Sequence, residues 1–348
     1  MLAPIRSLLP KFLIVSLGTG ASILGSGPAS AHVKWFCAFD VAGQPRGLEN
    51  VLCPDFELLV GLAMLVLVAG CVTEGTMVGA ALLRALNRVT GRLADDPEFL
   101  FRVICGFFFV ALWTTGGILL TPELKTDSTL VPWLQLAIAA GMTSRRTLPL
   151  SALGIVVLFG AAVWSYGLFH LMDYPIFLGV AAYLALSGLR KDFFGIRPLD
   201  IVRWATAITL MWASIEKWAY PEWSFPLFLA HPALTMGYDD EFFMRAAGVI
   251  EFTLAFALIW TPLVRRVAAV MLAGMFVSAI LEFGKLDAIG HAPIVAVLIA
   301  IIGDKAATPI ANRIRVLALA PACFAAAVAL FLGLYYLLHA ALFGTAII

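Results

Sequence analysis

The sequence predicts an all-α fold: a polytopic membrane helical bundle with about ten transmembrane helices after a signal peptide. Of its 348 residues, 62% are hydrophobic and 13% are charged, and the mean hydropathy is +0.97. A soluble domain of this length would carry about twice that charged fraction. Apolar runs near the length that crosses about 30 Å of hydrocarbon recur along the chain. Because backbone groups in lipid must be satisfied within their own segment, and the alternation of barrel strands is absent, these runs are predicted to be helices.

Residues 1–31 are typical of a secretory signal peptide. Arg6 and Lys11 form a positive n-region ahead of a short apolar stretch, and Ala29-Ser30-Ala31 fits an A-x-A cleavage site. Cleavage would make His32 the mature N-terminus. An uncleaved first membrane anchor is the alternative.

The distribution of basic residues predicts the orientation of the chain. Lys and Arg gather in alternate connections between the apolar segments, which places most of the 23 basic residues on one side. The positive-inside rule makes that side cytoplasmic. We therefore expect a multi-pass protein of a bacterial-type inner membrane, with the mature N-terminus and the C-terminus on the periplasmic side. The predicted spans are 56–82, 99–120, 130–144, 148–168, 175–189, 200–219, 242–263, 267–283, 291–303 and 316–341.

Two stretches of the chain read alike and predict an internal repeat. Both start with an arginine, Arg102 or Arg203, and both re-enter the membrane at a similar proline turn, Asp173-Tyr174-Pro175 or His291-Ala292-Pro293. Each holds four predicted helices and starts on the same side, so the repeat is parallel, as in some carriers. The predicted units are a signal peptide (1–31), an extracytoplasmic segment (32–55), a first helix with a cytoplasmic loop (56–98), repeat 1 (99–191), repeat 2 (199–305) and a C-terminal helix (306–348).

Two features of repeat 2 carry a resemblance to a known family. Arg203 stands at the cytoplasmic start of its first helix, and Ser214-Ile215-Glu216-Lys217 stands near the outer end. In these features the unit resembles the DoxX/DoxD-like family of integral membrane proteins. Repeat 1 keeps Arg102 but has Ile118 in place of the lysine, which would make it a scaffold. The resemblance implies a helical bundle, linked in some members to quinone-dependent sulfur or thiol oxidation, and it transfers no catalytic residue.

Three charged residues of repeat 2 are the first candidates for catalysis. Glu251 is placed near the bilayer midplane, where a charge costs about 2.5–3.5 kcal/mol, so it should face the bundle interior with a partner or carry a proton. Lys217 is expected to pair with Glu251 or Glu282. Glu216 precedes it by one residue, and adjacent helical residues point about 100° apart, so the two should serve different partners. A plain structural ion pair is the alternative.

The densest polar stretch, residues 282–291, is predicted to form a wall of the site. It contains Glu282, Asp287 and His291, and it is interrupted by glycines. Such a segment at membrane depth is tolerated only inside protein or along a cavity. We expect its carboxylates to join Lys217 and Glu251 in one enclosed pocket that opens to the exterior. A capped loop is the alternative.

Repeat 1 has a counterpart of this wall. His170 and Asp173 precede its re-entrant proline, so both repeats place a histidine and an aspartate there.

A metal site is a separate hypothesis. A free α-amino group and the imidazole of His32 together suit copper. His231, His291 and His170 are predicted on the same side and could supply a further ligand, although a lone loop histidine such as His231 is more often solvated.

Two cysteines, Cys37 and Cys53, flank an extracytoplasmic stretch. In an oxidising compartment they could form a structural disulfide. A dithiol that exchanges electrons with a quinone is the alternative.

Together these patterns predict a membrane component of a quinone-linked redox system that acts on sulfur compounds or thiols. Glu251 would carry a proton, and Lys217 would stabilise negative charge on the quinone oxygen. Since no cofactor motif is present, a redox or periplasmic partner protein is implied. Copper or other cation transport and a structural membrane subunit are the alternatives. The net charge of +1 gives no reason to expect nucleic acid as a partner, and the lipid bilayer is the expected surrounding.

Overall fold

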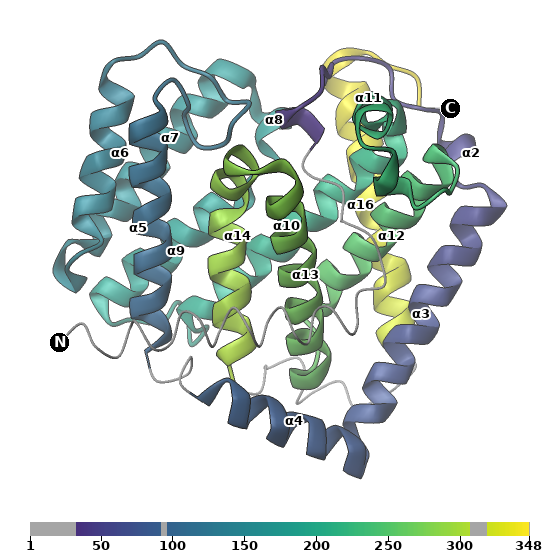
Figure 1. Ribbon diagram of the computed structural model, residues 1–348, viewed down its shortest axis with the longest axis horizontal. Helices are drawn as coiled ribbons and strands as arrows, with labels where there is room; N and C mark the ends of the chain where they lie inside the picture. Colours follow the sequence, from purple (N-terminus) through teal and green to yellow (C-terminus); the bar gives the residue numbers. More distant parts are fainter. Residues whose placement is uncertain (1–32, 92–95, 307–318, 348) are drawn as a thin grey trace.

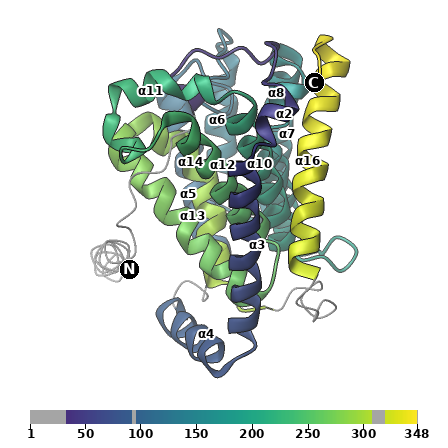
Figure 2. The same cartoon turned by 90° about the vertical axis from the view of Figure 1, so that its right-hand side faces the viewer.

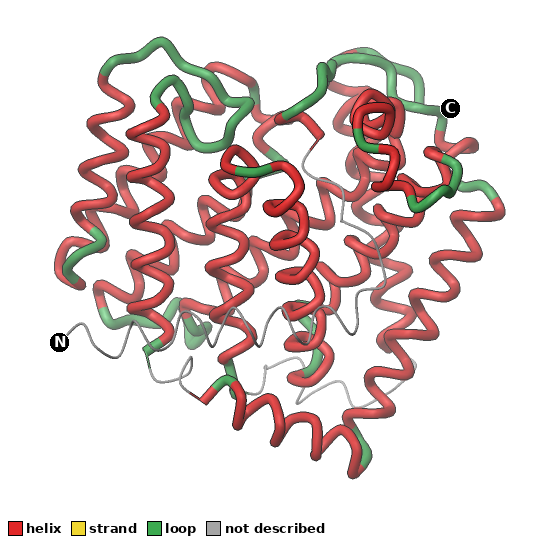
Figure 3. Tube along the Cα trace, viewed as in Figure 1, coloured by secondary structure: helices red, strands yellow, loops and turns green. Residues whose placement is uncertain are grey.

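A computed structural model describes residues 33–91, 96–306 and 319–347. These residues form helices joined by loops, and the described part holds two isolated β-bridges but no strand (Figure 3). The predicted signal peptide and His32 lie outside the described residues.

Each of the ten predicted spans overlaps a different one of ten longer helices in the described part of the chain. Several of these helices begin with a proline, whose fixed φ suits the first helical position and whose missing N–H has no partner there anyway. The helices are α3 (Pro54–Glu74), α5 (Pro97–Thr115), α6 (Leu130–Gly141), α7 (Leu148–Tyr166), α9 (Pro175–Leu189), α10 (Pro198–Ala219), α12 (Asp240–Ala257), α13 (Pro262–Phe283), α14 (Lys285–Gly303) and α16 (Leu319–Phe343).

Six helices in the described residues are long and apolar enough to cross a membrane: α3, α5, α7, α13, α14 and α16. The chain is therefore a multi-pass membrane protein by length and composition. The apolar helices α6 and α9 are shorter, with 12 and 15 residues, and α10 and α12 carry buried charged residues. The full set of ten spans stays a prediction.

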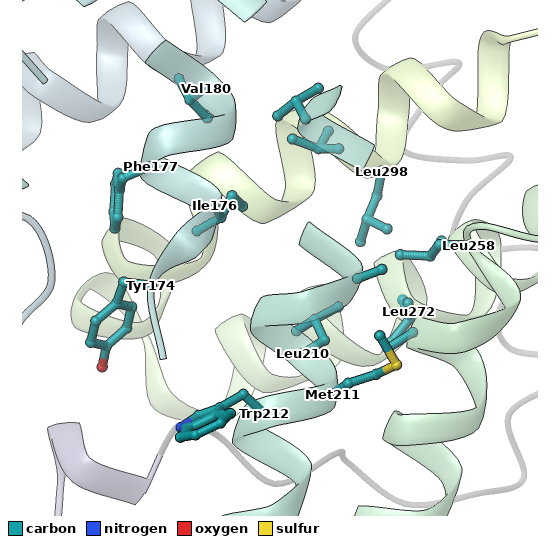
Figure 4. Packing of buried hydrophobic residues seen from close by; sticks show 14 of the residues in the cluster. Tyr174, Ile176, Phe177, Val180, Leu210, Met211, Trp212, Leu258, Leu272 and Leu298 are labelled. Carbon is teal, nitrogen blue, oxygen red and sulfur yellow. The ribbon is translucent and has the colours of Figure 1, made fainter. Parts of the chain in front are cut away.

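The long helices pack in a closed order. Along the chain α5, α6, α7 and α9 contact one another in sequence, then α10, α12, α13 and α14 do the same. The two groups meet where α9 packs on α10 and where α14 returns to α5. Apolar side chains of α9, α10, α13 and α14 fill the space between them, among them Ile176, Leu210, Leu272 and Leu298 (Figure 4). Helices α3 and α16 pack on the outside of this ring, against α12 and α10.

The bundle has two end faces. One, at the top of Figure 1, carries residues 33–53, the short helix α8 (Leu168–Leu171) and α11 (Phe225–Ala230); we call it the N-segment face, after the N-segment of residues 33–47. The other, at the bottom, carries α4 (Met77–Val89) and the predicted arginine-rich connections, and we call it the arginine face. The remaining short elements are η1 (Val33–Trp35), α2 (Leu48–Val51), η3 (Arg145–Thr147), η4 (Pro221–Ser224) and η5 (Pro232–Thr235).

The first predicted span, 56–82, is wrong at its end. Helix α3 stops at Glu74, and α4 is a separate helix whose N-cap Thr76 accepts a hydrogen bond from the Gly79 amide at 3.3 Å. Glu74 is held by the start of α13, where the Thr261 hydroxyl and the Leu263 amide donate to its carboxylate at 2.5 and 3.1 Å. This contact joins the end of α3 to the distant start of α13.

The predicted span 291–303 begins too late. The chain breaks at Gly284, where φ is +75°, and α14 then runs without interruption from Lys285 through Gly290 and Pro293. Positive φ is cheap only for glycine, so Gly284 makes the turn between α13 and α14.

Candidate functional site

The centre of the N-segment face is a lysine held between two carboxylates. Lys34, from η1, forms an ion pair with Asp173, just after α8, and lies 2.6 Å from a carboxylate oxygen of Glu216 on α10. The three side chains are 2%, 1% and 9% exposed. Because burial of an ionised group is costly unless it is paired, both carboxylates depend on Lys34 for a counter-charge.

A second ion pair lies beside the first. Lys217 on α10 meets Glu251 on α12 at 2.7 Å, with side chains 9% and 11% exposed. This is one of the two pairings expected from the sequence. Since Glu216 and Lys217 are adjacent in a helix, they point in different directions, and they do serve different partners. The two pairs together make a buried polar layer that joins η1, α10 and α12.

Aromatic residues of the N-segment close this layer. Trp35 packs on the His291 ring, with centroids 4.6 Å apart, and Phe39 contacts both His170 and Trp223. The Lys34 ammonium also lies 5.6 Å from the Phe39 ring centre, a favourable position for a cation over an aromatic face.

The N-segment is also tied down at its far end. Arg46 forms an ion pair with Glu241, the Tyr220 hydroxyl donates to the Gly43 carbonyl at 2.8 Å, and the Tyr336 hydroxyl donates to the Arg46 carbonyl at 2.6 Å. These contacts come from three different helices or loops, so the N-segment lies across the end of the bundle as part of the fold.

Two small cavities touch Lys217. One of about 20 Å³ is lined by Lys34, Glu216, Lys217, Tyr220 and Trp223, among others. The other, of about 10 Å³, is lined by Lys217 together with Arg46, Glu241 and Arg245. A water molecule needs roughly 10–15 Å³ of such space, so these cavities suit single water molecules and are too small for a ring-shaped ligand.

Next to Lys34 lies a group of buried polar atoms that accept no hydrogen bond within the described residues. These are the Oδ1 of Asp173, the Nε2 of His170 and the Oε2 of Glu123. The other Glu123 oxygen accepts from the Tyr174 and Thr121 hydroxyls. Burial raises the pKa of the Glu123 carboxyl, which favours its protonated form.

The surroundings of His170 predict a pH effect on stability. Burial lowers the pKa of His170 from 6.5 to about 4, and the nearby charge of Lys34 adds to the shift while Asp173 opposes it. Between these two pH values the unfolded chain binds a proton that the folded chain does not, so stability falls as the pH drops from about 6.5 to about 4. Thermal unfolding of His170→Gln should show a smaller loss between pH 7 and pH 5 than the parent protein. Equal losses would contradict this.

The predicted wall, residues 282–291, divides into two separate pairs. Asp287 and His291 lie one turn apart on α14, 3.0 Å from each other and fully inside the protein. Glu282 instead meets His231 at 2.8 Å near the surface, with side chains 42% and 36% exposed. The single pocket expected from the sequence is therefore wrong, because the turn at Gly284 sends Glu282 away from Asp287.

The predicted disulfide does not form: Cys37 and Cys53 are free thiols. Cys37 packs against a small cluster around Leu227 and Phe228, whereas Cys53 is the N-cap of α3 and packs on the main core. Burial raises the pKa of the Cys37 thiol, which disfavours the reactive thiolate.

The metal hypothesis gains no ligand set in the described part of the chain. No group of three or more His, Cys, Asp or Glu side chains that could hold a metal ion occurs there. His231 and His291 each pair with a different carboxylate, and His32 lies outside the described residues.

Sequence reasoning missed the role of Lys34. Lys34 is one of few basic residues on the predicted outer side, and it directly precedes Trp35-Phe36. The available signal was a lysine next to large aromatic residues on an otherwise acidic side. Its partners Asp173 and Glu216 were both candidate site residues. They lie 139 and 182 residues after Lys34, however, and no local sequence pattern connects residues so far apart. Comparisons with family models, with curated proteins and with solved structures find no match to this chain.

Proposed function

We propose that this chain exchanges protons on the periplasmic side of a bacterial-type inner membrane, as the membrane component of a quinone-linked redox system. In this proposal the N-segment face is outward and the arginine face is cytoplasmic. The basic residues of the connections on the arginine face support that orientation through the positive-inside rule. The two four-helix groups would be parallel DoxX-like repeats, and their like packing order supports that assignment.

The observation that carries the proposal is the charge balance around Lys34. One buried cation faces two buried carboxylates, Asp173 and Glu216, while Lys217 and Glu251 balance each other. Two carboxylates that share one site and one counter-charge cannot both ionise at low cost. One of them therefore holds a proton that it can exchange.

Water in two small cavities would connect this proton to the outer solution. The cavity beside Glu216 and the cavity beside Glu241 both reach Lys217, so two water-sized spaces lie between the buried pair and the rim residues Arg46 and Glu241. Lys217 would donate to both waters and hold them in place. Glu251 keeps this lysine positioned from the other side.

The proton site fits the redox reaction as a source or sink of protons. Reduction of a quinone takes two electrons and two protons, and its reoxidation returns them. The electrons would come from a thiol or sulfur compound through a partner protein, and the lipid-soluble quinone would arrive from the bilayer. Because the cavities are too small for a quinone ring, the protein would supply the proton to a quinone bound elsewhere in the complex.

Substituting one carboxylate tests this function. A proton donor that acts directly contributes about 100-fold or more to a rate. Glu216 would act through water, so Glu216→Gln is expected to slow quinone reduction by about tenfold. The measurement is quinone reduction by membranes that contain the protein and its natural electron donor. An unchanged rate of quinone reduction in Glu216→Gln would contradict the proposal.

Glu282→Gln is the matched control. This carboxylate lies on the same face but is about 42% exposed and pairs with His231 alone. Its replacement should leave quinone reduction unchanged.

A further inference from the structure

Helix α4 differs from the long helices in its direction. It follows α3 after a break of two residues, and in Figures 1 and 2 it lies across the ends of the other helices on the arginine face. Its main packing partners are α3 and α13. A helix that lies across the end of a membrane bundle lies along the bilayer surface.

The side of α4 that turns away from the bundle carries an apolar strip. Val78, Leu82 and Val89 recur at a spacing of four and seven residues, which puts them on one side of a helix. They are 62%, 45% and 67% exposed. The described part of the chain leaves this strip uncovered.

A cationic strip runs beside the apolar one. Arg84 and Arg88 are one turn apart and exposed, and neither forms an ion pair within the described residues. Acidic residues are absent from α4. A helix with an apolar strip next to free arginines matches the boundary between lipid tails and acidic headgroups.

Contacts with α13 and with the end of α3 hold helix α4 in this orientation. The buried Arg266 of α13 donates to the Asn87 side chain at 2.7 Å and to the Thr90 hydroxyl at 2.9 Å. Gly79 allows the close approach at the other end, because a Cβ there would lie 2.2 Å from the Thr73 carbonyl oxygen. The exposed strips are therefore held outward by fixed contacts at both ends of the helix.

We propose that α4 is a binding site for acidic phospholipids: its apolar strip enters the tail region, and Arg84 and Arg88 bind lipid phosphates at the membrane surface on the arginine face. The charge complementarity and the absence of any acidic residue on the helix select an anionic lipid surface as the occupant. This inference is independent of the proton site on the opposite face.

Competition between lipids tests the proposal. The full-length protein is purified from mixed phosphatidylglycerol and phosphatidylcholine, and the lipids that it retains are measured by native mass spectrometry. Each arginine near an acidic surface contributes about fivefold in affinity, so Arg84→Gln with Arg88→Gln should lower the preference for phosphatidylglycerol by about 25-fold. The preference of the parent protein should also fall as salt rises.

The matched control removes the same charge elsewhere on this face. Arg190 and Lys191, in the connection between α9 and α10, are exposed as well, and Arg190→Gln with Lys191→Gln should leave most of the preference in place. An unchanged preference in the α4 variant would overturn the proposal. Equal losses of the phosphatidylglycerol preference in both double variants would overturn it too, because they would reflect the net charge of this face and not a binding site on α4.

Discussion

Replacement of Lys34 by methionine is expected to lower the free energy of unfolding by about 3–5 kcal/mol, the usual cost of removing one partner from a buried ion pair. The change leaves Asp173 and Glu216 buried, facing the same space and without a counter-charge. It also loosens the start of the N-segment, because no other charged group of that segment lies as deep. Thermal or denaturant unfolding of the purified protein in lipid nanodiscs measures the loss.

Two further variants separate the effect of the buried charge from the effect of packing. Lys125→Met removes an exposed lysine from the same face and should change stability little. Combining Lys34→Met with Asp173→Asn and Glu216→Gln removes the buried charges together and should recover most of the loss. A triple variant no more stable than Lys34→Met alone would show that the lysine acts through packing and not through its charge.

Replacement of Gly290 by alanine is the second large effect that we expect. A Cβ at Gly290 would lie 2.0 Å from the ring of Trp35, so the substitution pushes the N-segment off α14. Overpacking of this kind costs about 1–3 kcal/mol. In an ordinary helix the same change is favourable by about 0.5–1 kcal/mol, so the sign of the effect is the diagnostic result.

Gly333→Ala provides the comparison for Gly290→Ala. Gly333 lies inside α16, and a Cβ there would meet nothing within 4 Å. It should leave the protein as stable as the parent or more so, while Gly290→Ala lowers the midpoint of thermal unfolding. Stabilisation by both substitutions would contradict the close contact between Trp35 and α14.

Helix positions could be predicted because they follow from local patterns. Apolar length and alternate basic connections located ten segments that each overlap a helix. The pairing of Lys217 with Glu251 was also within reach, since a charge at membrane depth in one helix requires a partner in a neighbour.

The coverage of the site by the N-segment could not be predicted from local patterns. It depends on the N-segment folding back over the bundle, and Lys34 meets Glu216 across 182 residues of sequence. No periodic pattern records such a contact. The same limit applies to the two boundary errors, because the end of α3 at Glu74 contacts the distant start of α13, and a single residue, Gly284, makes the whole turn before α14.

The difference between the predicted repeats has a structural counterpart. Helix α10 continues to Ala219 and presents Lys217 from its last turns, whereas α5 ends at Thr115, before two glycines with positive φ. Ile118, at the position of the lysine, is therefore in a loop, and its carbonyl accepts a hydrogen bond from the buried Gln135 at 2.6 Å. A lysine reaches the first four-helix group from the N-segment instead, where Lys34 pairs with Asp173.

Infrared spectroscopy of the carboxyl groups measures the shared proton beside Lys34 most directly. In the parent protein near neutral pH we predict a protonated carboxyl band that shifts in D2O and is lost in Glu216→Gln, where Asp173 and Lys34 balance each other, whereas the band of the protonated Glu123 carboxyl is present in both. Lys34→Met should strengthen the band. A spectrum in which Glu216→Gln removes no such band would mean that both carboxylates are ionised beside a single lysine, and it would contradict the proton-exchange account.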